Sequence, residues 1–411
     1  MKQETSTFII TQEWGEDVYS KLSWFKQKNV KSANVMVVGC GALGNEVIKN
    51  LALFGIEHLV LVDYDIVEYS NLSRSILFSS EDIKVRRKKV EAIANKLREI
   101  NPAVQILPIC GNVSHDIGLG LLRMMDVVIG CVDNRWARYC LNRLCMRAGV
   151  PWVDGGIEGL DGVAKVFIPG QNCYACNLGP EALKELSRNM SCASAIQRNE
   201  KAERVATTPI VASIIGAVQV QEAMKLIHKE ELNSGKLTSL CGKMFYYEGQ
   251  HLTSRVLDFQ GYDEDCPVHE YWDSILQSNI SVEDNVQEVF LQLTELLRVE
   301  QIEICLRNHC FVDFIVEKRN DSRYETMLPN YAIADFVETD SVLRFIPFSE
   351  LYQHEFKILD MDFPYKSLTL EQIGFPAWDI LHVNTEKGTF YVELADNLFY
   401  SNFLSKKRIS A

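Results

Sequence analysis

The chain has 411 residues, of which 47% are hydrophobic and 24% are charged, and its formal net charge is −13. This length allows two or three domains with sizeable cores, and the composition is that of a globular protein. The acidic balance argues against a general nucleic-acid or membrane binder. We find no apolar run long enough to span a bilayer and no leader-like start, so we expect a cytoplasmic protein. Its twelve cysteines should then be thiols, unless their spacing indicates a metal site or catalysis.

A glycine-rich motif near the N-terminus predicts a nucleotide-binding unit. An apolar run ending at Val38 leads into Gly39-x-Gly41-x-x-Gly44, and a second apolar run ends at Asp63. Such a turn lets the backbone approach a phosphate, the next helix offers its N-terminus, and the acid suits a ribose diol. The alternative is a structural turn with small residues for packing. The strand before and the acid after favour a nucleotide, but they do not say which one.

Apolar runs alternate with helical patterns up to about residue 260, which is typical of a mostly parallel sheet covered by helices. We therefore predict an α/β, Rossmann-like fold with helices on both faces of the sheet. Residues 1–33 read as an N-terminal helical segment, and residues 34–275 as the nucleotide-binding domain. The predicted strands are Val35–Val38, Leu59–Val62, Val104–Ile109, Val127–Val132, Pro151–Ile157 and Val163–Ile168.

A polar segment over residues 177–208 interrupts this pattern. Thr208 and Pro209 then begin a long apolar helix, as N-cap and first-turn residue. The acidic, turn-rich stretch 261–284 indicates a boundary. Beyond it, residues 285–411 predict a smaller α+β domain, with a helix over Val286–Leu297 and strands over Ile302–Leu306 and Phe311–Val316. Its end is faintly similar to the closing part of a β-grasp fold, and a generic α+β domain is about as good an interpretation.

Polar residues after the second and fourth strands suit a triphosphate better than a dinucleotide. Arg74 can form a two-pronged contact with phosphate oxygens, and Asn71 could orient a phosphate or a carboxylate. Asp133 follows an apolar strand at the sheet edge where open α/β folds bind ligands, and a carboxylate facing phosphates naturally holds Mg²⁺. The alternative role for Asp133 is a helix cap, and one residue could serve both.

Two ligand pairs predict a metal site. Cys173-x-x-Cys176 is followed about ninety residues later by Cys266-x-x-His269. Each pair alone could be buried thiols, but together they favour tetrahedral Zn²⁺. Four protein ligands close the coordination sphere, so we expect a structural zinc rather than a catalytic one.

Residues 34–260 resemble the adenylating domain of the ubiquitin-activating enzyme superfamily, which includes the adenylyltransferases for the molybdopterin and thiazole sulfur carriers. The shared motifs are the glycine turn, "VDYDIVEYSNLSR", Lys89 twelve residues before Asn101-Pro102, and "CVDNRWARY". The resemblance implies that ATP occupies the cradle and that the C-terminal glycine of a β-grasp protein attacks the α-phosphate. It assigns the ribose to Asp63, phosphates to Asn71, Arg74 and Lys89, Mg²⁺ to Asp133 and zinc to the Cys/His set. The cofactor-binding set is Gly39, Gly41, Gly44, Asp63, Asp65, Asn71, Arg74, Lys89 and Asp133.

Two positions decide the subclass. Family members carry an N-terminal arginine that reaches the partner subunit's ATP site, but here no arginine precedes Arg74, and Lys21 falls at about that position. Cys192 lies in the polar segment 177–208, which we call the crossover, and resembles the thiol that accepts a ubiquitin-like protein as a thioester. Its alternative is a cysteine without a role. The neighbouring Lys88 leaves open which lysine points inward.

The reading we adopt is a homodimeric, bacterial-type activating enzyme for a ubiquitin-like β-grasp protein. It adenylates the C-terminal glycine and captures it on Cys192, with Arg74, Lys89 and Asp133 as the other catalytic residues. Its cofactors are ATP, Mg²⁺ and Zn²⁺, and residues 285–411 would recruit a conjugating enzyme. The rivals are a sulfur-carrier adenylyltransferase for molybdopterin or thiazole synthesis and a catalytically silent scaffold subunit. A nicotinamide dehydrogenase leaves Asn71, Arg74 and Asp133 unexplained.

Overall fold

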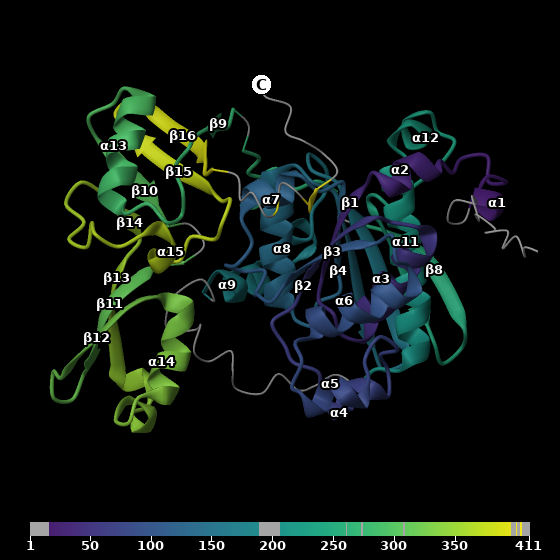
Figure 1. Ribbon diagram of the computed structural model, residues 1–411, viewed down its shortest axis with the longest axis horizontal. Helices are drawn as coiled ribbons and strands as arrows, with labels where there is room; N and C mark the ends of the chain where they lie inside the picture. Colours follow the sequence, from purple (N-terminus) through teal and green to yellow (C-terminus); the bar gives the residue numbers. More distant parts are fainter. Residues whose placement is uncertain are drawn as a thin grey trace, which may run out of the picture.

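An eight-stranded sheet forms the centre of the larger part of the protein (Figure 1). The computed structural model describes residues 16–188, 206–259, 261–272, 274–306, 309–395, 400 and 403–404. The strand order is β3-β2-β1-β4-β5-β6-β7-β8, with β1 to β5 parallel and the rest antiparallel. The strands are β1 (Asn34–Val38), β2 (His58–Val62), β3 (Gln105–Ile109), β4 (Val127–Gly130), β5 (Trp152–Glu158), β6 (Asp161–Phe167), β7 (Lys243–Glu248) and β8 (Thr253–Asp258).

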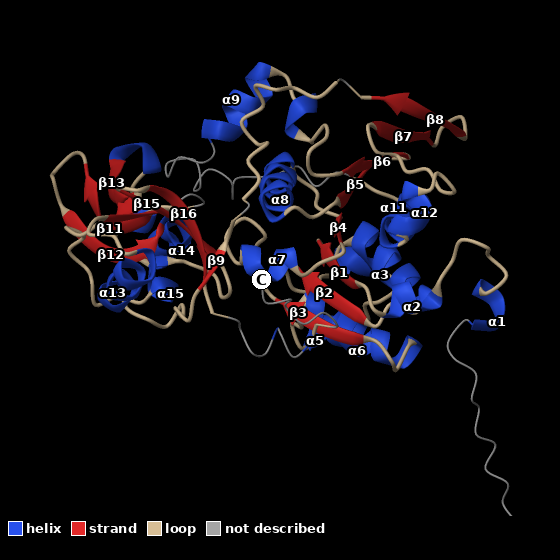
Figure 2. Cartoon of the chain, turned by 90° about the horizontal axis from the view of Figure 1, so that it is seen from above, coloured by secondary structure: helices blue, strands red, loops and turns tan. Residues whose placement is uncertain are grey.

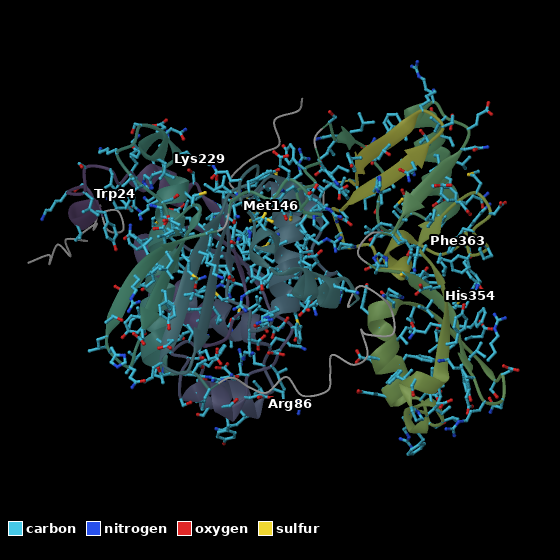
Figure 3. The ribbon with its side chains drawn as sticks, turned by 180° about the vertical axis from the view of Figure 1, so that it is seen from behind. Trp24, Arg86, Met146, Lys229, His354 and Phe363 are labelled. Atoms are coloured by element: carbon cyan, nitrogen blue, oxygen red, sulfur yellow. The ribbon has the colours of Figure 1, made fainter. Side chains whose placement is uncertain are left out.

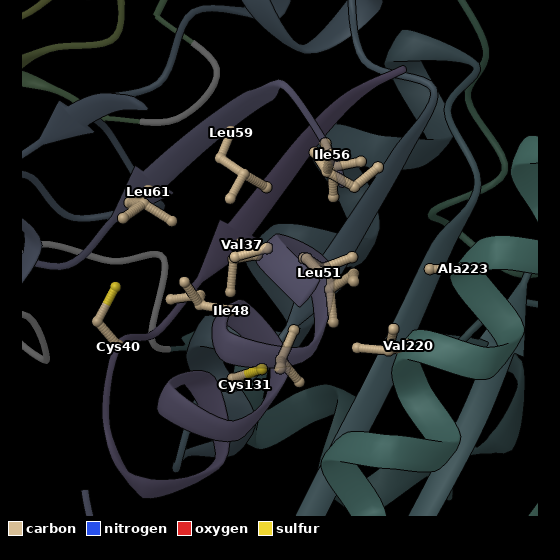
Figure 4. Close-up of a cluster of buried hydrophobic side chains, with 14 of the residues drawn as sticks. Val37, Cys40, Ile48, Leu51, Ile56, Leu59, Leu61, Cys131, Val220 and Ala223 are labelled. Carbon is tan, nitrogen blue, oxygen red and sulfur yellow. The ribbon is translucent and has the colours of Figure 1, made fainter. Parts of the chain in front are cut away.

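Helices cover both faces of this sheet because its central strands are apolar on both sides. In β1, Val35 and Val37 enter one core and Met36 and Val38 enter another. Figure 4 shows the first core, where Val220 and Ala223 of one helix lie near Leu51 of another. The first core includes α3 (Ala42–Phe54), α6 (Lys89–Ile100) and α11 (Pro209–Ile227), and the second includes α7 (Leu119–Arg123) and α8 (Arg135–Ala148). The predicted fold class is confirmed.

The helix α11 begins where the sequence predicts. The Thr208 hydroxyl accepts a hydrogen bond from the Val211 N–H, and Pro209 occupies the first turn. In the part of the chain that the structure describes, α11 is the one helix long and apolar enough to cross a membrane, and 61% of its apolar window is buried inside the protein. It packs on α3 and on β5, so its apolar surface is used within the core.

The remaining helices of this part are short or lie at its edges. The polar segment that interrupts the sequence pattern contains one of them, α9, which the sequence analysis did not predict. These helices are α1 (Glu16–Tyr19), α2 (Gln27–Lys31), α4 (Tyr69–Leu72), α5 (Ser80–Lys84), α9 (Pro180–Arg188) and α12 (Lys229–Asn233).

Two smaller sheets make up the C-terminal part, which lies beside the larger part in Figures 1 and 2. A five-stranded sheet has the order β14-β10-β15-β16-β9, and a three-stranded sheet has the order β12-β11-β13. The elements are β9 (Leu276–Gln277), α13 (Val286–Leu297), β10 (Ile302–Cys305), β11 (Phe311–Glu317), β12 (Arg323–Pro329), α14 (Ile333–Thr339), β13 (Leu351–Phe356), β14 (Ile358–Leu359), α15 (Leu370–Ile373), β15 (Ile380–Thr385) and β16 (Gly388–Glu393).

The change from one part to the other falls inside the acidic, turn-rich stretch. The large sheet ends with β8 at Asp258, and the five-stranded sheet begins with β9 at Leu276. The C-terminal part has two cores: α13 and the five-stranded sheet enclose one cluster, and α14 and the three-stranded sheet enclose another. Its residues Trp378 and Ile380 also enter the second core of the large sheet. In Figure 3, Trp24 and Lys229 lie at one end of the molecule and Phe363 and His354 at the other.

The C-terminal part is docked on the large domain through α7. The Leu119 N–H donates to Asp379, the Gly120 N–H donates to the Trp378 carbonyl at 2.9 Å, and Arg123 forms an ion pair with Glu393 at 2.9 Å. Beyond β16 the chain returns to the large domain, where Phe403 accepts a hydrogen bond at its carbonyl from His58. Contacts at two places therefore hold the C-terminal part against the sheet domain.

Candidate functional site

Three glycines build a cradle between β1 and α3, and each has a different physical reason. Gly39 has a positive φ of +92°, and a Cβ there would lie 2.5 Å from the Cys131 carbonyl oxygen. A Cβ on Gly44 would lie 2.0 Å from the Gly39 carbonyl oxygen. A Cβ on Gly41, the N-cap of α3, would meet nothing within 4 Å. Gly39 and Gly44 therefore shape the turn, whereas Gly41 leaves open space at a helix N-terminus, where an anion can approach the backbone.

Asp63 is fixed by the cradle itself. One carboxylate oxygen accepts a hydrogen bond from the Cys40 N–H at 2.7 Å, and the other accepts one from the Asp65 N–H at 2.8 Å. Burial raises the pKa of Asp63, while the positive charge of Lys89 and the two N–H donors lower it. The parallel neighbours β1 and β2 end at the same edge, so the carboxylate lies beside the glycine turn.

Lys89 points into this edge, and its ammonium group forms an ion pair with Asp65 at 2.6 Å. Its side chain is buried, whereas Lys88 is half-buried and occupies the N-cap position of α6. Burial alone would lower the pKa of Lys89, but the carboxylates of Asp63 and Asp65 raise it above its ordinary value. The lysine therefore carries its charge at the strand ends, next to two carboxylates.

Arg74 lies on the loop that follows α4 and contacts a residue far along the chain. Its Nη1 donates to the Thr207 hydroxyl at 2.9 Å, and its Nε is buried without a hydrogen-bond partner. Asn71 is also buried, but its amide oxygen accepts the Glu68 N–H and completes a capping box on α4. The structure thus leaves Arg74 with unused donors and gives the Asn71 oxygen a structural task.

Asp133 is exposed after β4, next to β1 at the point where the strand order reverses. Its Oδ1 accepts a hydrogen bond from the Asn134 side chain, and Asn134 rather than Asp133 caps α8. The helix-cap alternative for Asp133 is therefore wrong. Burial raises the pKa of Tyr64, and the negative charges of Asp65 and Asp133 raise it further.

The carboxylates of Asp63 and Asp65 and the ammonium group of Lys89 thus lie together at the strand ends beside the glycine turn. An acid oriented by backbone donors can accept ribose hydroxyls, and a lysine beside an open helix N-terminus can bind phosphates. The exposed Asp133 carboxylate is a donor of the kind that Mg²⁺ prefers. These features are those expected of a nucleotide-binding site in an α/β protein.

The predicted metal ligands come together at one place. All four ligand atoms of Cys173, Cys176, Cys266 and His269 lie within 4.8 Å of one another. The Sγ atom of Cys173 is 3.8 Å from that of Cys266 and 3.6 Å from that of Cys176. Atoms at the corners of a tetrahedron with a zinc–sulfur distance of about 2.3 Å lie about 3.8 Å apart. Three buried thiols and an imidazole gathered at one point are a ligand set of the kind that holds a structural Zn²⁺.

Two predicted residues are not part of this geometry. Cys192 lies outside the described residues, and Lys21 is exposed after α1. Sequence reasoning missed Thr207, because 133 residues separate it from Arg74 and a single threonine carries no motif. It also missed the Asp65–Lys89 ion pair, although both residues were assigned to the nucleotide site.

Known proteins resemble this chain over its N-terminal part. A match to the ThiF family spans residues 7–268. The chain is 33% identical over 242 residues to the SAMP-activating enzyme E1 of Haloferax volcanii, covering 59% of this chain and 82% of that protein. It is 34% identical over 217 residues to the molybdopterin-synthase adenylyltransferase of Salmonella typhimurium, covering 51% of this chain and 80% of that protein. A crystal structure of E. coli MccB with succinimide is 25% identical, with a TM-score of 0.47, over 59% of this chain and 68% of that one.

The protein is thus a nucleotide-binding member of a family of adenylating enzymes. The chain belongs to the ThiF family, and through it to the ubiquitin-activating enzyme superfamily. The family match ends at residue 268, before the C-terminal part begins.

Proposed function

We propose that the protein uses ATP to adenylate the C-terminal glycine of a ubiquitin-like β-grasp protein. The observation that carries this proposal is the open N-terminus of α3, where Asp63 accepts the Cys40 N–H of the glycine turn and Lys89 pairs with the neighbouring Asp65. In this assignment Asp63 binds the ribose, and Gly41, Lys89 and Arg74 bind the phosphates. The carrier carboxylate attacks the α-phosphorus, and pyrophosphate leaves with the electrons of the broken P–O bond. The two cations stabilise the charge that develops on the phosphate oxygens.

Two metal ions belong to this proposal. Asp133 is exposed at the sheet edge, where its carboxylate would hold Mg²⁺, and the ion would neutralise phosphate charge. The Cys/His set would hold Zn²⁺ and join the loop after β6 to the chain that leaves β8. With four protein ligands the zinc would have a closed coordination sphere, so its role would be structural.

We further propose that Cys192 accepts the carrier as a thioester. Its thiolate would attack the acyl adenylate, a carbon–sulfur bond would form, and AMP would leave. The support is its place in the crossover that ends at Thr207, the residue that contacts Arg74.

The C-terminal part would then recruit a conjugating enzyme. The protein would act in the cytoplasm as a homodimer, and Lys21 of each subunit would serve the nucleotide site of its partner.

A sulfur-carrier adenylyltransferase is the second candidate. It is favoured by the relative from Salmonella, whose name is that of a molybdopterin-synthase adenylyltransferase. This function needs adenylation but no thiol acceptor. The two candidates therefore share the nucleotide site and differ at Cys192.

The test mixes the purified protein with ATP, Mg²⁺ and candidate β-grasp proteins that end in glycine. Carrier-dependent exchange of labelled pyrophosphate into ATP would support adenylation, and a thiol-labile adduct on a non-reducing gel would support the thioester. The adduct should vanish in Cys192→Ala while exchange persists. Exchange without an adduct would favour the sulfur-carrier function, and no exchange with any carrier would contradict both candidates and favour a scaffold subunit.

A further inference from the structure

The contact between Arg74 and Thr207 joins two segments that no motif connects. The Arg74 Nη1 donates to the Thr207 Oγ1 at 2.9 Å, and Nε is buried without a partner. Among the residues that the structure describes, Arg74 forms no ion pair with a carboxylate. A guanidinium group held by a neutral hydroxyl keeps its whole charge for an incoming anion, whereas a carboxylate partner would neutralise it.

Thr207 is itself held in place by the sheet. It forms an isolated parallel bridge with Gly159, just after β5, and the Gly159 N–H donates to the Ala206 carbonyl at 2.8 Å. The next residue, Thr208, is the N-cap of α11. The Thr207 hydroxyl therefore stands at a fixed point, where the crossover returns to the sheet and α11 begins.

We propose that Thr207 is a positioning residue for Arg74 and that it makes the ATP affinity depend on the end of the crossover. The hydroxyl fixes one edge of the guanidinium group and leaves its other donors for the phosphates. A displacement of residues 206–207 would release that edge. This inference rests on the proposed function, because it requires that Arg74 binds phosphates of ATP.

Neighbouring threonines with different tasks provide matched variants. Thr207→Val keeps the branched shape but removes the hydroxyl, and Thr207→Ser keeps the hydroxyl. Thr208→Val makes the same chemical change one residue later, where it removes the cap bond to the Val211 N–H. A merely structural effect would appear in both valine variants, whereas the proposed effect belongs to Thr207 alone.

The experiment measures the dissociation constant of ATP with Mg²⁺ by calorimetry on the full chain, without a carrier. We expect Thr207→Val to weaken binding about tenfold, since a hydrogen bond to a charged group is lost. Thr207→Ser should stay within about twofold of the unmodified protein. Thr208→Val should lower the melting temperature and leave the dissociation constant unchanged.

A double-mutant cycle with Arg74→Ala decides whether Thr207 acts through Arg74. We expect Thr207→Val to cost nothing further once Arg74 is removed. Additive losses, or equal weakening by Thr207→Ser, would overturn the proposal. If the protein binds ATP tightly but shows no carrier-dependent pyrophosphate exchange, the proposed function is contradicted. The mutant cycle then still decides whether Thr207 acts through Arg74. If the unmodified protein does not bind ATP, the proposed function and this inference fall together.

Discussion

At the scale of single residues, the glycine cradle separates folding from binding. Gly39 and Gly44 face backbone atoms of the protein, and Gly41 faces open space. The motif therefore contains two positions where the fold requires a glycine and one, Gly41, where the fold would accept a Cβ. The three glycines look alike in the sequence, and only their surroundings distinguish them.

Gly41→Ala should weaken ATP binding by tenfold or more while the melting temperature changes little. The added Cβ meets no protein atom but occupies the approach to the helix N-terminus. Calorimetry with ATP measures the affinity, and thermal unfolding of the same sample measures the melting temperature. In Gly44→Ala the Cβ would lie 2.0 Å from a carbonyl oxygen, so that variant should lose stability first. Unchanged ATP affinity in Gly41→Ala would contradict the assignment of the cradle.

At the scale of elements, two loops far apart in the sequence are joined by the Cys/His set. Cys173 and Cys176 follow β6, and Cys266 and His269 follow β8. The Cys176 Sγ lies 3.0 Å from the His269 Nε2, so each loop supplies ligands to the same point. A metal there would tie both loops and the start of the C-terminal part together.

The purified protein should contain about one zinc ion per chain, and Cys173→Ser should lose most of it. Removing one ligand leaves an open coordination sphere, which weakens zinc binding. In the unmodified protein, a chelator that removes the zinc should lower the melting temperature by several degrees. Elemental analysis and thermal unfolding measure both effects. Cys110→Ser is the control, since Cys110 is an exposed thiol outside the set. Zinc content equal in both variants would show that the four residues do not bind it.

The helix α7 docks the C-terminal part by close approach of its backbone. A Cβ on Gly120 would lie 2.5 Å from the Trp378 ring and 2.6 Å from the Trp378 carbonyl oxygen. The Gly120 N–H donates a hydrogen bond to that same carbonyl at 2.9 Å, and this bond holds the two backbones close together. The sequence of α7 thus has a glycine inside a helix because another backbone passes over it.

Gly120→Ala should loosen this contact, because the backbone of Trp378 must move away. We expect faster amide exchange at the docking contact and a melting temperature lower by several degrees. Hydrogen exchange read by mass spectrometry resolves the position of the change. Gly179→Ala is the matched control, since its Cβ meets nothing within 4 Å and its φ is not positive. Equal exchange in the two variants would contradict a close-packed contact at α7.

At the scale of the whole molecule, a buried acid lies where the two parts meet. Asp379 accepts the Leu119 N–H and is buried. Burial raises its pKa from 3.8 to about 6, although the N–H donors of Leu119 and Ile380 and the charge of Arg147 lower it. The folded protein therefore holds a proton that the unfolded chain releases between these two pH values. Stability contributed by this group is present below pH 3.8 and is lost as the pH rises to about 6.

Asp379→Asn should remove this pH dependence, because an amide cannot ionise. The unfolding free energy of the unmodified protein should fall by about 2 kcal/mol more than that of the variant between pH 4 and pH 7. Urea unfolding at both pH values gives the difference. Asp362→Asn, at an exposed position, should follow the unmodified protein. Parallel curves for Asp379→Asn and the unmodified protein would contradict the raised pKa.

The sequence by itself determined the local elements and the members of the Cys/His set. Apolar strands after helical patterns indicated the sheet, Thr208 and Pro209 indicated α11, and the Val286–Leu297 helix has the predicted bounds. Ligand spacing identified the Cys/His set, because two short-range pairs keep their meaning wherever the fold places them. These signals are local, and local propensity and spacing are what a sequence displays directly.

Only the tertiary structure decided which distant residues share a task. It placed Lys89 rather than Lys88 against Asp65, and it brought Thr207 to Arg74. It gave the Asn71 oxygen a capping role, and it docked α7 on Trp378. Such contacts depend on packing between segments separated by tens to hundreds of residues. No periodicity or motif records them, because a hydrogen bond or a close approach between such segments is fixed only when both sit on the folded sheet.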